Sequence, residues 1–260
     1  MPRNLGPGMR ILCCQHDVSW EDKAATCDRV ASLIDAAEPS AGALIVLPEM
    51  FATGFSMNSE VLAEELGVGP TFAFLGETAR RHNCPLLAGL LVREGDTLAN
   101  EAVLIARDGT VAGRYAKMHP FTFAGEDRVV SAGSKVTTFT LPEGKVTPFI
   151  CYDLRFPEVF RAADPESTLF VVIANWPAAR VAHWQALLRA RAIENQAFVV
   201  GVNRVGDDPN VTYSGHSMVI DPMGEILADA GDCETILDLD LDLAAATRWR
   251  AEFPAQDDRK

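Results

Sequence analysis

Short runs of consecutive apolar residues recur along the chain, and most of them lack the polar alternation of a half-exposed strand. The run over residues 168–174 is the clearest. Such runs are typical of strands that are covered on both faces. The pattern therefore predicts buried strands over residues 10–15, 43–47, 85–93, 98–107, 111–116, 145–150, 168–174, 198–203, 217–220, 226–228 and 235–239.

Stretches with apolar residues at helical spacing separate the predicted strands. The clearest helix covers residues 179–196, where Arg189 and Arg191 point away from the apolar stripe. That stripe consists of Val181, Trp184, Leu188 and Ala192. Further helices are predicted over residues 21–37, over 60–83 with a break at 67–70, and over 241–250. The alternation predicts one α/β domain in which two sheets pack face to face with helices outside.

The domain is expected to cover residues 9–260, after a loose tail over residues 1–8 that lacks the apolar core of a signal peptide. The chain of 260 residues is 48% hydrophobic and 23% charged, which is ordinary for a globular protein. Its apolar runs are far shorter than the about 20 residues that a membrane span requires. We therefore expect a cytoplasmic protein that does not enter a membrane.

The net charge of −13 restricts the partners of the chain. Nucleic-acid phosphates favour clusters of Lys and Arg, and an anionic membrane surface does the same. The sequence is therefore predicted to bind neither. A substrate with a carboxylate would need cations placed locally in its binding site, because the overall negative field does not attract it.

Six cysteines are present, but their spacing matches neither a zinc site nor a secreted disulfide framework. Cys13 and Cys14 are neighbours on a predicted strand, so their side chains should face opposite sides. A metal site built from Cys13, Cys14 and His16 is an alternative, but core thiols and a surface imidazole account for these residues better. No metal ligand is assigned.

Glu49, Lys117 and Cys151 each close a short apolar run. A buried strand tolerates a charge poorly unless the charge is paired or lies where the strand ends. Open α/β sheets bind ligands at the carboxyl ends of their strands, so three such groups can converge on one pocket. A base, a cation and a thiol together suit acyl transfer through a thioester. The three residues are therefore predicted to form a catalytic site.

Cys151 precedes a segment, 152–158, that is typical of a tight turn into a helix whose first residue is Pro157. A strand–turn–helix elbow exposes the residue at its bend and directs backbone N–H groups into the same space. A helix start and a nearby lysine are expected to lower the pKa of the Cys151 thiol. From spacing alone, an inert core thiol explains Cys151 equally well.

Two glutamates and a histidine need separate interpretation. Glu49 has apolar neighbours in the sequence, and such an environment suits a general base. Glu126, within 123–127, is a second candidate carboxylate, although an acidic loop residue is the simpler interpretation. His119 is interpreted as a loop residue, because the sequence places no third group to orient it.

Three segments match a known family when they are taken together. The segments LPEMF (47–51), YAKMH (115–119) and ICYDLRFP (150–157) resemble the nitrilase (carbon–nitrogen hydrolase) superfamily in kind and in order. The chain is most similar to the omega-amidase branch, through MFATGFSM (50–57), NWP (175–177), HWQALL (183–188), RARAIENQ (189–196) and EFP (252–254). The resemblance implies a four-layer αββα sandwich that assembles as homodimers or larger homo-oligomers.

Carried over by position, the resemblance implies that Glu49 is the general base, that Lys117 stabilises the oxyanion, and that Cys151 is the nucleophile. It implies that Glu126 is a second active-site glutamate that orients the pocket. The backbone N–H of Tyr152 would complete the oxyanion hole. Neither a metal nor an organic cofactor is expected in such a reaction.

The resemblance also implies a small-molecule amide substrate. Omega-amidases act on the monoamides of short 2-oxo dicarboxylic acids, such as 2-oxoglutaramate and 2-oxosuccinamate. The substrate carboxylate must meet a cation, for which Arg180 and Arg155 are the candidates. Arg155 could instead brace the elbow or pair with Glu158. Trp176 and Phe55 are candidate apolar walls, although core packing explains them equally well.

Two alternatives stay open. Another amidase, a carbamoyl-amine hydrolase or a nitrilase would use the same thioester chemistry on a different small substrate. A non-catalytic binding protein could retain the fold, but the presence of Glu49, Lys117 and Cys151 together argues against it.

Overall fold

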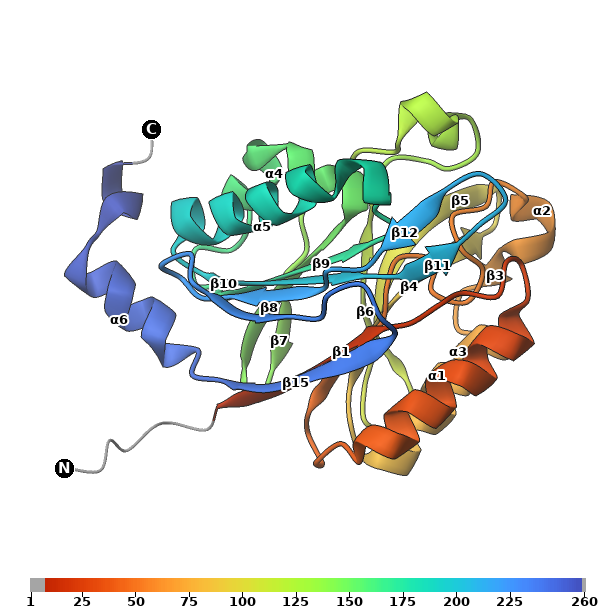
Figure 1. Ribbon diagram of the computed structural model, residues 1–260, viewed down its shortest axis with the longest axis horizontal. Helices are drawn as coiled ribbons and strands as arrows, with labels where there is room; N and C mark the ends of the chain where they lie inside the picture. The colour runs from red at the N-terminus through yellow and green to blue at the C-terminus, as the bar shows by residue number, and fades with distance from the viewer. Residues whose placement is uncertain (1–7, 259–260) are drawn as a thin grey trace.

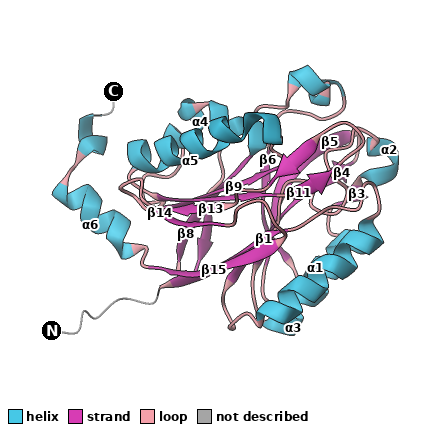
Figure 2. Cartoon of the chain, in the orientation of Figure 1, coloured by secondary structure: helices cyan, strands magenta, loops and turns pink. Residues whose placement is uncertain are grey.

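Two β-sheets pack face to face in the middle of the computed structural model, which describes residues 8–258 (Figure 1). Helices cover the outer faces of the two sheets, and Figure 2 shows the strands enclosed between them. Helices α1 (Lys23–Ala37) and α3 (Pro70–His82) lie on one side, and α4 (Pro157–Arg161) and α5 (Val181–Asn195) lie on the other. The predicted four-layer αββα sandwich is confirmed.

The first sheet has seven strands, in the order β15–β1–β2–β4–β5–β6, with β3 paired to β4. Strands β1, β2 and β4 run parallel, whereas β15, β5 and β6 are antiparallel to their neighbours. The bounds are β1 (Met9–Gln15), β2 (Leu44–Val46), β3 (Glu64–Glu65), β4 (Leu86–Glu94), β5 (Thr97–Ile105), β6 (Val111–Ala116) and β15 (Thr235–Leu241).

The second sheet has six strands, in the order β14–β13–β10–β9–β8–β7. Its central strands β8, β9 and β10 are parallel, so their carboxyl ends lie at the same edge. The bounds are β7 (Phe139–Leu141), β8 (Gly144–Ile150), β9 (Leu169–Ala174), β10 (Phe198–Asn203), β13 (Met218–Ile220) and β14 (Ile226–Asp229). A separate hairpin pairs β11 (Val205–Asp207) with β12 (Thr212–Ser214).

The first sheet separates two hydrophobic clusters. One fills the space between the sheets and beneath α4 and α5, and the other lies under α1 and α3. Cys13 belongs to one cluster and Cys14 to the other, which confirms their opposite orientation. His16 is fully buried, because the loop that carries Phe51 covers the end of β1, and the expectation of a surface imidazole is wrong. Within residues 8–258, no three His, Cys, Asp or Glu side chains are grouped as metal ligands would be.

Helix α5 buries more than its apolar stripe. Arg191 points away from that stripe, as predicted, and is buried: its Nε and Nη2 donate to the Leu154 carbonyl oxygen at 3.1 and 2.7 Å, and its Nη1 contacts Glu194 at 2.8 Å. The helix thus buries a second face against the turn that follows β8. A stripe of apolar residues could not reveal this contact, because the acceptor lies 37 residues earlier in the chain.

Short elements account for the remaining differences. The region predicted as helix before the break contains only α2 (Ser59–Leu62) and the two-residue strand β3. Strands β3, β7, β11 and β12 escape prediction because they are only two or three residues long and, unlike β2 and β13, are not apolar throughout. The last helix, α6 (Ala244–Glu252), lies at one end of the sandwich near the C-terminus (Figure 1). Its Ala246 is buried in the main core cluster, and its Arg250 donates to the Ser167 and Asn195 carbonyls.

Of the predicted N-terminal tail, residues 1–7 lie outside the described residues. The predicted helix over 241–250 begins later than expected, because β15 continues to Leu241 before α6 starts. Across residues 8–258, none of the helices is both long enough and apolar enough to cross a membrane.

Candidate active site

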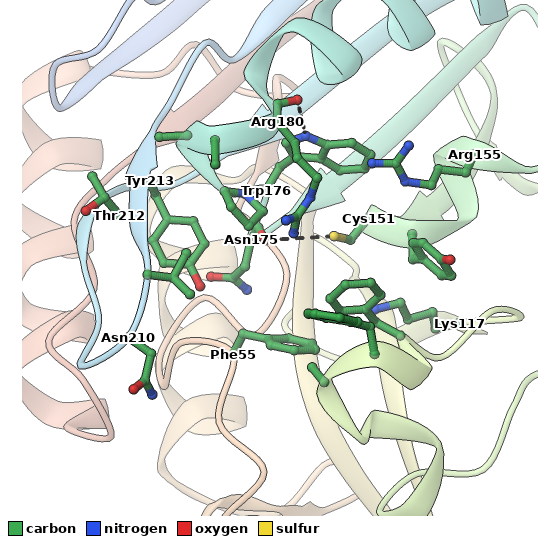
Figure 3. Close-up of a pocket in the computed structure, with 18 residues that line it drawn as sticks. Phe55, Lys117, Cys151, Arg155, Asn175, Trp176, Arg180, Asn210, Thr212 and Tyr213 are labelled. Carbon is green, nitrogen blue, oxygen red and sulfur yellow. Dashed lines mark hydrogen bonds between the residues drawn. The ribbon is translucent and has the colours of Figure 1, made fainter.

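The structure brings Glu49, Lys117 and Cys151 together although they follow three different strands. Glu49 lies in the loop after β2, Lys117 directly follows β6, and Cys151 directly follows β8. Because β6 and β8 belong to different sheets, the site lies where the two sheets meet. Lys117 and Cys151 line a pocket of about 510 Å³, which Figure 3 shows in close-up.

Lys117 holds two glutamates together beside the pocket. Its Nζ lies 2.8 Å from Glu49 Oε1 and 2.8 Å from Glu126 Oε2, and all three side chains are almost wholly shielded from solvent. Burial by itself lowers the pKa of Lys117, but the two carboxylates raise it more, so the pKa lies above its ordinary value. The ammonium is therefore charged and offsets one of the two buried carboxylates.

Cys151 occupies the bend between β8 and the short 3-10 helix η3 (Cys151–Arg155). Its φ of 46° lies in the left-handed region, which costs a non-glycine residue about 1–2 kcal/mol. Asp153 holds this bend from within, because its Oδ2 accepts the Ile150 N–H at 3.1 Å and the Tyr115 hydroxyl at 2.8 Å. The strand–turn–helix elbow is thus present, and α4 follows it at the expected residue.

The surroundings of Cys151 keep its thiol protonated. Burial raises the pKa of the thiol, and the carboxylates of Glu49 and Glu126 raise it further against the lowering effect of Lys117. The expectation of a lowered thiol pKa is therefore wrong, because burial and two carboxylates outweigh one ammonium. A neutral thiol needs a base when it attacks, and Glu49 is a carboxylate beside it.

His119 is a loop residue, but the structure supplies an orienting group that the sequence did not reveal. Its backbone N–H and ring Nδ1 lie 2.9 and 3.0 Å from Asp153 Oδ1. The imidazole also stacks on Phe156, with ring centroids 3.8 Å apart. His119 therefore braces the elbow through Asp153.

Two asparagines that the sequence analysis did not single out contact the glutamates. Asn100 Nδ2 donates to Glu49 Oε1 at 2.7 Å and to Glu126 Oε1 at 2.8 Å. The backbone N–H of Asn175 donates to Glu49 Oε2 at 2.9 Å. A signal for Asn100 exists in the sequence, because Asn100 and Glu101 interrupt an otherwise apolar run over residues 98–105.

Aromatic side chains form much of the pocket wall. Phe55, Tyr152 and Trp176 all line it (Figure 3). The Arg155 guanidinium lies 4.8 Å from the centre of the Trp176 ring, and its Nη2 is 3.3 Å from His183 Nδ1. These contacts hold Arg155 against the wall of the pocket.

Arg180 extends into the pocket toward Cys151 (Figure 3). Its guanidinium lies 5.8 Å from the centre of the Phe121 ring, and its backbone carbonyl accepts the Trp176 Nε1–H at 2.8 Å. The backbone is thereby fixed while the charged group stays directed into the cavity. Both predicted arginines line the pocket, and the guanidinium of Arg155, unlike that of Arg180, lies over the Trp176 ring.

Comparison with known proteins gives consistent matches over almost the whole chain. A family model described as carbon-nitrogen hydrolase matches residues 10–251. The 2-oxoglutaramate amidase of Bacillus subtilis (strain 168) is 35% identical over 251 residues, which cover 95% of this chain and 96% of that protein. Omega-amidase YafV of Escherichia coli (strain K12) is 38% identical over 257 residues, which cover 97% of each protein.

A solved structure also matches this chain over nearly its whole length. XC1258 from Xanthomonas campestris, described as a CN-hydrolase superfamily protein with an arsenic adduct in the active site, has a TM-score of 0.91 to this chain. The two sequences are 33% identical, and the match covers 98% of each chain.

Proposed function

Because this chain belongs to the carbon–nitrogen hydrolase family, we propose that it hydrolyses the distal amide of short 2-oxo dicarboxylic acid monoamides, such as 2-oxoglutaramate and 2-oxosuccinamate. The observation that carries the proposal is the buried contact of Lys117 with Glu49 beside the Cys151 thiol. The names of two relatives, 2-oxoglutaramate amidase and omega-amidase, support this substrate class. Residues 9–260 would act as one catalytic domain.

In the first step, Cys151 Sγ attacks the amide carbonyl carbon while Glu49 accepts the thiol proton. The carbonyl oxygen becomes an oxyanion, which the Lys117 ammonium and the backbone N–H of Tyr152 stabilise. Because the thiol is neutral at rest, its proton leaves only as the carbon–sulfur bond forms.

The tetrahedral intermediate then collapses to a thioester. Glu49 passes its proton to the amide nitrogen, the carbon–nitrogen bond breaks, and ammonia leaves. Glu49 next takes a proton from water, and the water oxygen attacks the thioester carbon. The carbon–sulfur bond breaks, and the proton held by Glu49 returns to Cys151 Sγ. One amide and one water thus give one carboxylic acid and one ammonia, without a cofactor.

Glu126 is assigned an orienting role. Its Oε2 contacts Lys117 Nζ at 2.8 Å and also accepts the backbone N–H of Phe121, which lines the pocket. Glu126 therefore fixes the direction of the ammonium and holds the adjacent loop. It makes no proton transfer in this scheme.

Arg180 is assigned to the substrate carboxylate. A guanidinium presents paired N–H donors that match a carboxylate, and Arg180 directs its own into the cavity (Figure 3). Trp176, Phe55 and Tyr152 would confine the short carbon chain between this cation and the thiol. Arg155 would support the wall through Trp176 rather than bind the carboxylate.

The assembly and the compartment are proposed on separate grounds. Edge strand β14 exposes Ile226 and Leu227, and α5 exposes Ile193, to about half of their full surface. Exposed apolar side chains that gather in this way mark interaction surfaces, so we propose a homodimer or a larger homo-oligomer. All six cysteines are free thiols, which suits the reducing cytoplasm. Light scattering on the purified protein measures the assembly.

Ammonia release tests the proposed activity. Wild type and Cys151→Ala are compared on 2-oxoglutaramate and on a neutral aliphatic amide of equal length. Wild type should prefer 2-oxoglutaramate and form the dicarboxylic acid, and Cys151→Ala should release no ammonia. A wild-type preference for the neutral amide would remove the carboxylate assignment, and an active Cys151→Ala would remove the mechanism.

Product analysis separates the related chemistries. A carbamoyl-amine hydrolase releases carbon dioxide together with ammonia, and a nitrilase consumes a nitrile. This protein is expected neither to release carbon dioxide nor to consume a nitrile.

A further inference from the structure

Asn100 lies on β5, fully buried, between the two glutamates of the site. Its Nδ2 donates to Glu49 Oε1 at 2.7 Å and to Glu126 Oε1 at 2.8 Å. Both N–H bonds of a single amide are therefore used on the two carboxylates. Lys117 Nζ contacts the same pair at 2.8 Å each, so the carboxylates are joined through two separate donors.

The charges of this cluster do not balance. Two carboxylates share one ammonium, and the Cys151 thiol is neutral because its pKa is raised. Two carboxylates that share a site normally force one of them to take up a proton, and burial strengthens this tendency. Hydrogen bonds to the ionised form oppose it. Asn100 supplies two such bonds without adding a charge.

A neutral donor has an advantage over a second cation at this position. A second ammonium or guanidinium beside Glu49 would stabilise the carboxylate so strongly that it would accept a thiol proton less readily. The amide of Asn100 keeps Glu49 ionised yet leaves the cluster with one excess negative charge.

We propose that Asn100 is a positioning residue that keeps Glu49 and Glu126 ionised together and so maintains Glu49 as a free base. The inference rests on the proposed role of Glu49 as the proton acceptor of Cys151. The backbone supports the arrangement, because the Asn100 carbonyl accepts the Lys117 N–H at 2.9 Å. One residue thus sets the places of the cation and of both carboxylates.

The titratable groups that face the two carboxylates come from several elements. Lys117 follows β6, Cys151 opens η3, and Glu49 and Glu126 face one another across Asn100. Lys117 is charged over the whole working range, because its pKa is raised. His119 and Asp153 also brace the elbow, so the difference between variants, rather than the pH dependence of wild type alone, reports on the glutamates.

The test uses Asn100→Leu, which keeps the approximate shape and removes both donors, and Asn100→Asp, which adds a third acid. The rate of iodoacetamide alkylation at Cys151 is followed by mass spectrometry from pH 4 to 9, beside the pH profile of kcat/KM. Without the amide, one carboxylate should keep its proton to higher pH. Each profile has an acid limb, over which the rate falls as the pH is lowered. The midpoint of this acid limb should move to higher pH, by about one unit in Asn100→Leu and by more in Asn100→Asp.

A second background distinguishes this role from simple packing. In Glu126→Gln only one carboxylate remains for Lys117, so adding Asn100→Leu should move the acid limb much less than it does in wild type. Asn195→Leu removes another buried asparagine, far along α5, and should leave the limb in place. An unmoved limb in folded Asn100→Leu, or an equal shift in both backgrounds, would overturn the proposal.

The outcome is separable from that of the proposed function. Alkylation reports on the thiol without any amide substrate, so it still tests Asn100 if ammonia release fails. Circular dichroism establishes that each variant is folded. Should Asn100→Leu fail to fold, Asn100→Asp decides the matter, because it differs from asparagine by one terminal group, and an unmoved limb in it contradicts the proposal.

Discussion

Lys117 Nζ lies 2.8 Å from Glu49 Oε1, and 68 residues of chain separate the two. A buried ion without a partner costs several kcal/mol, so neither charge would be tolerated alone at this depth. Strands β4 and β5 lie between β2 and β6 in the first sheet, yet the loop after β2 and the end of β6 bring these residues into contact. Each charge therefore depends on the other for its stability at this depth.

Lys117→Met should leave two buried carboxylates without their cation. We expect a loss of about 3–5 kcal/mol in the free energy of unfolding at pH 7 and a loss of about 100- to 1,000-fold in kcat. Urea unfolding at pH 7 and ammonia release measure these effects.

The matched control is Lys145→Met. Lys145 is partly exposed and contacts Asp164 at 2.7 Å, so its loss should cost far less stability than the loss of Lys117 and leave kcat unchanged. Equal losses of stability and kcat in the two variants would show that the buried contacts of Lys117 contribute no more than the partly exposed contacts of Lys145.

Glu49→Gln should slow the alkylation of Cys151 by about 100-fold at neutral pH. Burial, which is the largest cause, and the remaining Glu126 carboxylate still raise the pKa of the thiol in this variant, so without a base the reaction must wait for the small thiolate fraction. That fraction grows as the pH rises, and the rate should recover in alkaline solution. Mass spectrometry of the alkylated protein measures the rate at each pH.

Glu101→Gln is the control for this experiment. Glu101 is also buried, but its carboxylate pairs with Arg114 at 2.8 Å outside the site. Alkylation should keep its wild-type rate in this variant. A Glu49→Gln protein that reacts as fast as wild type at pH 7 would contradict the role of Glu49 as base.

Cys151→Gly should be more stable than Cys151→Ala. The residue at the elbow has a φ of 46°, where an L side chain is strained and glycine is not. We expect a difference of about 1 kcal/mol in the free energy of unfolding in favour of glycine. Urea unfolding of the two variants, both inactive, measures it, and equal midpoints would mean that the bend carries no strain.

Gly89→Ala should damage the site through the backbone. A Cβ atom on Gly89 would lie 2.5 Å from Glu49 Cα and 2.7 Å from the Met50 nitrogen, so the loop that carries the base must move. We expect a loss of about 1–3 kcal/mol in stability and about 100-fold in kcat. Thermal unfolding and ammonia release measure the two effects.

Gly201→Ala separates these two losses. A Cβ on Gly201 would meet the side chains of Trp184 and Leu188 in the core, away from the catalytic loop. This variant should lose comparable stability but keep most of its kcat. A similar fall in kcat for both variants would contradict the claim that Gly89 affects catalysis by positioning the loop that carries Glu49.

Arg180→Gln should raise KM for 2-oxoglutaramate by about 10- to 100-fold, because it removes a charged donor to the substrate carboxylate. The KM for a neutral amide of equal length should change little. Arg155→Gln should have the smaller effect, since Arg155 stacks on Trp176. Steady-state kinetics on both substrates decide between the two arginines, and an equal effect of Arg180→Gln on both amides would argue against the clamp.

The sequence by itself determined the order of the strands and helices, the elbow at Cys151 and the three residues that follow apolar runs. These features are local, because apolar periodicity, turn residues and helix starts depend on neighbours within a few positions. The four-layer arrangement followed from the resemblance and from strands that are covered on both faces.

Only the tertiary structure decided which polar and charged side chains contact one another. Asn100 joins two carboxylates that lie 51 and 26 residues away from it, and Arg191 is buried against the distant Leu154 carbonyl. The direction of the Cys151 pKa depends on the balance of burial, two carboxylates and one ammonium, which no local pattern contains. Solvent exclusion and charge balance are properties of the packed molecule, so they exist only after the two sheets have met.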